Sequence, residues 1–114
     1  MKKAASLAQL ERQFLRGREE LSQLGYISQG SVQDRTARSG GGAGYQWTRK
    51  VAGKTVTVSL TAEQFYRMKE AVKNRRKLSS ILGRMEKISR QILFKALPHP
   101  DRRKQLSPRV LGLN

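Results

Sequence analysis

Cysteine is absent from the sequence, and histidine occurs once, as His99 between Pro98 and Pro100. Without cysteine the chain forms no disulfide bond and no thiolate metal site. A single histidine cannot supply a histidine-rich metal site or a Cys-His catalytic pair. We therefore expect no metal ion and no cofactor.

Acidic residues are scarce. The 114 residues include 24 Lys and Arg but only 8 Asp and Glu, which gives a formal net charge of +16 and a pI of about 11.3. A positive charge of this size opposes compaction and favours polyanions as partners, either nucleic acid or an anionic membrane surface.

Patterns typical of catalysis are missing as well. The acids are scattered, and Asp34 is the only one between Gly25 and Leu60, whereas a metal-dependent nuclease needs several carboxylates or histidines. Ser31 and Tyr45 have no histidine base, and GGGAG at residues 40–44 lacks the Gly-Lys-Ser/Thr ending of a P-loop. We expect no enzyme activity and no small-molecule substrate.

Long apolar runs are also absent. No run of 18 apolar residues occurs, so we expect no membrane span, and the Met-Lys-Lys start is not followed by the apolar stretch of a signal peptide. The apolar stripes carry few aromatic residues and are committed to packing, which argues against binding at a membrane surface. These features predict a soluble intracellular protein of one domain.

Apolar residues at helical spacing predict two long helices, at residues 4–24 and 62–97. Gly25 ends the first helix, and Thr61 with Gln64 forms a capping box at the start of the second, which Pro98 terminates. Both helices carry seams that predict pairing as a coiled-coil-like stalk. The seam of the second helix changes phase near Arg75, which indicates a kink or a change of packing partner there. The seams comprise Leu7, Leu10, Phe14, Leu21 and Leu24 in the first helix, and Phe65, Met68 and Val72, then Leu78, Ile81, Met85, Ile88 and Ile92 in the second.

The residues between the helices predict a small antiparallel sheet of two or three strands. An irregular strand covers residues 26–37, with a bulge at Gly30, and a β-hairpin covers residues 45–60 around an Ala52-Gly53 turn. The expected fold is therefore α+β, as a single α-β-β-β-α domain over residues 1–97. Residues 98–114 form a basic C-terminal tail with no helix beyond a single turn.

Alternation along the hairpin separates two faces. Tyr45, Trp47, Val56, Val58 and Leu60 share an apolar face that we expect to pack on a helix, with Trp47 in the core rather than in direct contact with a ligand. The opposite face is wholly polar and has a basic turn. A solvated sheet face has the same pattern, but hydroxyls and amides also contact phosphates and base edges, and a two-stranded ribbon fits a major groove.

The second helix supplies most of the charge. Residues 66–95 hold ten Lys and Arg against two Glu, and KNRRK at residues 73–77 is the densest patch. Solvated helix faces normally mix signs, so this imbalance favours contact with phosphates. The predicted nucleic-acid-binding residues are Arg35, Arg38, Gln46, Thr48, Arg49, Lys50, Lys54, Thr55, Thr57, Lys73, Arg75, Arg76 and Lys77.

The segments GYISQGSVQDR, YQWTRKVAGKTVTVSLTAEQF and NRRKLSSILGRMEKIS resemble a family of small basic bacterial proteins of unknown function, often encoded near transposases. The resemblance covers roughly residues 5–95. Its most specific part is a Tyr-x-Trp-x-x-Lys-x-x-Gly-Lys-Thr block, matched by Tyr45, Trp47, Lys50, Gly53, Lys54 and Thr55. Many members carry a cysteine cluster before that tyrosine, which this chain lacks, so a metal-binding role does not transfer. The hairpin and helix also resemble the arm-binding domains of some integrases, at the level of fold alone.

These observations predict a non-catalytic nucleic-acid-binding protein of the bacterial cytoplasm, associated with the nucleoid or with a ribonucleoprotein and linked to mobile elements. The target is DNA or RNA. One alternative is an interaction module whose seams form a homodimer or dock on a larger enzyme such as a transposase. Another is a ribonucleoprotein component that orders fully only on RNA.

Overall fold

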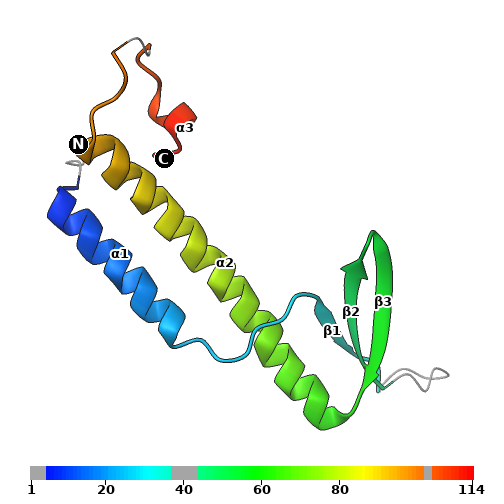
Figure 1. The fold of residues 1–114 in the computed structure, drawn as a ribbon. Helices are drawn as coiled ribbons and strands as arrows, with labels where there is room; N and C mark the ends of the chain where they lie inside the picture. The colour runs from blue at the N-terminus through cyan, green and yellow to red at the C-terminus, as the bar shows by residue number, and fades with distance from the viewer. Residues whose placement is uncertain (1–4, 37–43, 102–103) are drawn as a thin grey trace. The chain divides into compact units, whose positions relative to one another are not determined.

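The computed structural model describes residues 5–36, 44–101 and 104–114, and it confirms an α+β fold with a three-stranded antiparallel sheet and one long helix (Figure 1). Among these residues, no helix combines the length and apolarity that crossing a membrane requires. The elements in chain order are α1 (Leu7–Ser22), β1 (Ser31–Asp34), β2 (Tyr45–Val51), β3 (Lys54–Leu60), α2 (Ala62–Ala96) and α3 (Pro108–Leu111).

The chain divides into two compact units. Leu24–Leu78 form one, which we call the sheet unit, and Met1–Gln23 with Ser79–Asn114 form the other, which we call the helical unit. The division falls within α2, close to Arg75, where the apolar seam changes phase. The two parts of α2 therefore pack on different partners, one of the two outcomes that the phase change predicts. A single domain over residues 1–97 stays a prediction.

The sheet has the strand order β1-β2-β3, and its hairpin has the predicted register. Val51 lies opposite Lys54, Trp47 opposite Val58 and Tyr45 opposite Leu60. This register follows from the two-residue turn, because each step along β2 is matched by one step back along β3.

The turn is strained at its first residue. Ala52 has φ 50°, the only positive φ of a non-glycine residue in the described chain, and Gly53 has φ 80°. A two-residue hairpin turn with positive φ at both positions matches the twist of the strands, but a Cβ atom there is costly. The twist of the strands therefore overrides the local preference of Ala52.

We expect Ala52→Asn to raise the free energy of unfolding by about 1 kcal/mol, because asparagine tolerates the left-handed conformation better than alanine. Ala52→Val is the matched control and should lower it, because a β-branched residue fits positive φ worst. Urea denaturation measures both changes. Equal stability of the two variants would show that the turn is not strained.

The first strand is shorter than predicted. Residues 26–37 were expected to form an irregular strand, but only Ser31–Asp34 pair with β2. Gly30, with φ 105°, forms a bend directly before β1 and not the predicted bulge within the strand. Residues 26–28 bond to α2 instead, because the buried Asn74 amide donates to the Tyr26 carbonyl at 2.9 Å and the Ser28 N–H donates to the Ala71 carbonyl at 3.1 Å.

The sheet packs on the start of α2. The capping box is formed as predicted, with the Gln64 N–H donating to the Thr61 hydroxyl at 3.1 Å and the Thr61 N–H donating to the Gln64 side chain at 2.9 Å. One turn on, Phe65 is 5% exposed, and its ring centroid lies 4.6 Å from that of Tyr45. The helix covers only part of the apolar face, because Val58 remains 38% exposed.

Asp34 fixes the end of β1. Its carboxylate accepts from the Thr36 hydroxyl at 2.6 Å and from the Thr36 N–H at 3.0 Å, while the Arg35 N–H donates to the Gly44 carbonyl at 2.8 Å. The hydrogen bond from the Thr36 hydroxyl, followed by that from its N–H, holds the pKa of the Asp34 carboxyl below its ordinary value of 3.8. Both bonds favour the charged form.

Because the folded pKa of Asp34 is depressed, its carboxylate stabilises the fold at pH values above 3.8, and this stability is lost as the pH falls through the lower folded pKa. We expect Asp34→Asn to remove this part of the acid dependence. Thermal unfolding between neutral and acid pH, for the wild type and the variant, measures the difference. Parallel curves over that range would contradict the assignment.

In the helical unit, α1 runs antiparallel to the second part of α2 (Figure 1). The Arg84 guanidinium pairs with the Glu20 carboxylate at 2.5 Å, and the Lys95 ammonium donates to the Ala5 carbonyl at 2.8 Å. Leu10 and Ile81 are 4% and 7% exposed and form the core of this unit.

The first helix is shorter than the predicted range of residues 4–24. Ser6 caps it by accepting from the Gln9 N–H at 3.2 Å, which sets Leu7 as its first residue. It ends at Ser22, where the Gln23 N–H turns back to the Glu20 carbonyl at 3.2 Å, before Gly25 is reached.

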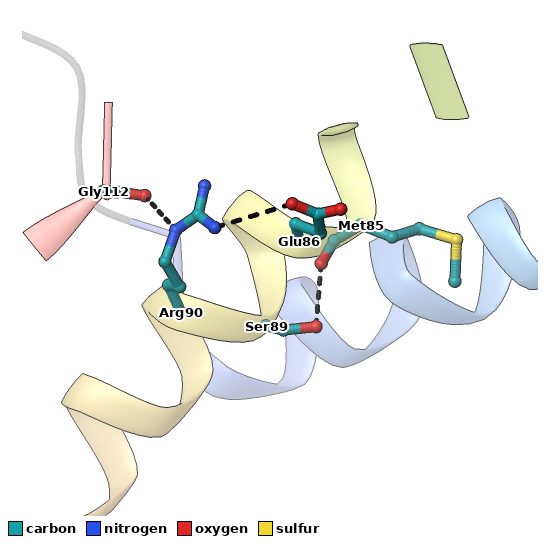
Figure 2. A network of polar contacts seen from close by, with 5 residues as sticks. All are labelled: Met85, Glu86, Ser89, Arg90 and Gly112. Carbon is teal, nitrogen blue, oxygen red and sulfur yellow. Dashed lines mark hydrogen bonds and ion pairs between the residues drawn. The ribbon is translucent and has the colours of Figure 1, made fainter. Parts of the chain in front are cut away.

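The C-terminal tail forms one helical turn, α3, which docks on α2. Arg90 Nε donates to the Gly112 carbonyl at 2.7 Å, and the Gln91 amide donates to the Leu113 carbonyl at 2.9 Å. Figure 2 shows the Arg90 side chain between Gly112 and Glu86, whose carboxylate lies 3.9 Å away. The tail is thus attached through its backbone carbonyls, an arrangement for which its sequence carried no signal.

Candidate nucleic-acid interface

The side of the sheet away from Trp47 carries only polar side chains, in three rows that cross the strands. We call this surface the polar face. Since alternate residues point to the same side, the pairing of β1, β2 and β3 defines its members. The rows are Gln33, Gln46 and Ser59; Ser31, Thr48 and Thr57; and Lys50 and Thr55. The polar face therefore has one positive charge and no acid.

The polar face is open to solvent. Gln46 and Thr48, on the central strand, are half-buried, and the other six members are exposed. The hydroxyls of Thr48 and Thr57 lie 3.4 Å apart, within hydrogen-bonding distance. The face turns away from α2, because Tyr45, which contacts Phe65, lies on the opposite side of the same strand. Its amides and hydroxyls are therefore available to a partner.

Cations gather at the turn end of the sheet, where Lys50 belongs to the polar face and Arg49 and Lys54 come from the opposite side. Lys50 and Lys54 are exposed, and the Arg49 guanidinium lies 4.4 Å from the centroid of the Trp47 ring, in a cation–π contact. A hollow of about 380 Å³ opens here, bounded by Arg49, Lys50, Thr48 and Thr55 together with Ser31 and Gly30. It combines positive charge with hydroxyl groups, the chemistry that phosphate oxygens require.

Trp47 lies at the edge of this site, half-buried rather than deep in a core. Its indole N–H donates to the Gln29 carbonyl at 3.0 Å, and Arg49 covers its ring. A Cβ atom on Gly30 would come within 2.6 Å of the Thr48 carbonyl, so only glycine fits beside it. Trp47 thus fixes the loop before β1 against β2, next to the hollow.

The predicted helix cations form a separate group. Lys73, Arg76 and Lys77 are exposed and Arg75 is half-buried. Val72 and the neighbouring Ala71 and Asn74 are buried, so the exposed cations point away from the packed side of α2. The polar face also points away from α2. The structure therefore does not bring the hairpin residues and the helix residues onto one surface.

Arg35 lies beside the polar face, and its Nε donates to the Gln33 side chain at 3.1 Å. Arg38 lies outside the described residues. Three polar-face members, Ser31, Gln33 and Ser59, were not among the predicted site residues. The alternation of Ser31 and Gln33 with Val32 is a signal for the first two, but it fixes the face only once the strand phase is known.

Comparisons with protein-family models, curated proteins and solved structures found no match to this chain. In the described parts of the chain, no three His, Cys, Asp or Glu side chains lie close enough together to hold a metal ion. The interpretation of the site therefore depends on its own chemistry.

Proposed function

We propose that the protein binds nucleic acid without catalysing a reaction, and that the polar face of the sheet is its main contact surface. One observation carries this proposal: eight polar side chains, none acidic, form three open rows that end at a basic turn. Residues 24–78 support it further, because eleven Lys and Arg against three acids give this unit a net charge of +8.

The side chains divide by role. Lys50 on the polar face, with Lys54 and Arg49 beside it at the turn end of the sheet, holds backbone phosphates, which supplies affinity without sequence preference. Gln46 and Thr48, on the central strand, are placed to reach base edges, because a β-ribbon entering a major groove presents its outward side chains to them. The exposed cations of α2 form a second phosphate surface on the other side of the unit.

The test is fluorescence anisotropy with a DNA duplex and an RNA hairpin over a range of salt concentrations. We expect Lys50→Gln with Lys54→Gln to weaken binding and to lower the slope of log affinity against log salt by about one for each lysine lost. Lys73→Gln with Lys77→Gln removes the same charge from α2 and should have the smaller effect. An equal or larger loss in the α2 variant would contradict the polar face as the main surface.

A second candidate function is an interaction module in which α1 and α2 form a coiled-coil stalk that pairs with another protein or a second copy. Exposed apolar side chains near the end of α2 favour it, since Leu93, Phe94 and Leu97 are 54%, 42% and 59% exposed. Analytical ultracentrifugation distinguishes the candidates. A dimer that Leu93→Asp with Leu97→Asp converts to a monomer supports the module, and a wild-type monomer at all concentrations contradicts self-pairing.

A further inference from the structure

A second basic hollow lies in the helical unit, along one side of the antiparallel helix pair. Its volume is about 440 Å³, and its polar lining comes from Gln13 and Arg16 of α1 and from Arg84, Lys87 and Gln91 of α2. None of these residues belongs to the sheet unit, so the hollow is independent of the polar face.

The lining follows helical spacing on both elements. Gln13, Arg16 and Glu20 are three and four residues apart, so they follow one stripe of α1. Arg84, Lys87 and Gln91 follow the equivalent stripe of α2. Because the Glu20–Arg84 pair sets the antiparallel register, Arg16 and Lys87 come to the same stretch of the hollow.

The charges along this side do not compensate one another. Positions that flank a helix pair usually carry opposite charges, which form salt bridges across it. Here only Arg84 has an acidic partner, Glu20. Arg16 and Lys87 make no hydrogen bond or ion pair through their side chains with any described residue. Two cations that line one hollow repel each other. An anion bound between them would attract both and offset that repulsion.

We propose that this hollow binds a backbone phosphate of the same nucleic acid, as a second attachment point outside the sheet unit. This inference rests on the proposed function for the identity of the anion. The Arg16 guanidinium presents a planar fork of donors to phosphate oxygens, Lys87 adds a point charge, and the Gln13 amide adds a neutral donor. Neither Arg16 nor Lys87 was among the residues predicted from the sequence.

Two attachment points on one chain have a measurable consequence. Once the polar face is bound, the hollow meets the rest of the same nucleic acid at a high effective concentration, so a long molecule binds more tightly than a short one. Loss of the hollow should therefore weaken binding to a long duplex and leave binding to a short duplex nearly unchanged.

The test compares Arg16→Gln with Lys87→Gln against a matched control, Arg12→Gln with Arg109→Gln. The control removes two exposed cations from the same unit that do not line the hollow. We expect the hollow variant to lose about tenfold in affinity for a long duplex and the control to lose less than about twofold. Circular dichroism melting checks that both variants fold.

Equal losses in the two variants would overturn the inference, because the effect would then follow total charge. A hollow variant that loses affinity for inorganic phosphate but not for the long duplex would also overturn it, since the site would then serve a free anion. A third variant, Lys50→Gln with Lys54→Gln, is measured separately as the sheet variant and distinguishes failure of one proposal from failure of the other. If the sheet variant binds normally while the hollow variant does not, the polar-face proposal fails and the hollow stands.

Discussion

The twist and alternation of the β2–β3 hairpin constrain everything else in the sheet unit. A two-residue turn at Ala52-Gly53 fixes the register, and the register places all apolar residues of the hairpin on one side and all uncharged polar residues on the other. A shift of one residue would turn Trp47 and Val58 to solvent and bury the threonines. The positive φ of Ala52 costs free energy, but it permits the two-residue turn that sets this register, and the burial of the apolar side offsets the cost.

The sequence predicted the features that depend on local chemistry. The hairpin register follows from alternation and turn length, and the start of α2 follows from Thr61 and Gln64. The phase change near Arg75 indicated a kink or a change of packing partner, and the division after Leu78 agrees with the second of these. The hairpin register and the start of α2 depend on contacts between neighbours in sequence, so the spacing of those residues carries the information.

Features set by distant contacts were not predictable in the same way. The length of β1 depends on Asn74 and Ala71, which bind residues 26–28 to α2 and leave only four residues to pair with β2. Which residues of β1 lie on the polar face depends on how β1 pairs with β2, and this pairing places Ser31 and Gln33 there. The hollow beside α1 needs the Glu20–Arg84 register, which connects residues 64 positions apart. The predicted helix cations are close in sequence to the sheet but point away from it.

Both units carry exposed Lys and Arg side chains, but the neighbouring groups differ between the units. In the sheet unit, lysines border rows of hydroxyls and amides; in the helical unit, arginine and lysine face a hollow with one ion pair at its end. Charge alone gives binding that falls with salt whatever the sequence of the nucleic acid. Under the proposed function, the polar face is therefore the surface that would supply any preference for a sequence or structure.

The most direct measurement is an NMR titration that follows the methyl groups of β3 as nucleic acid is added. Thr55 and Thr57 belong to the polar face, and Val56 and Val58 alternate with them on the opposite side of the same strand. If the polar face is the contact surface, the threonine methyl signals shift strongly with a DNA duplex or an RNA hairpin and the valine signals shift little. Larger shifts at the valines, or small and equal shifts at all four, would contradict it.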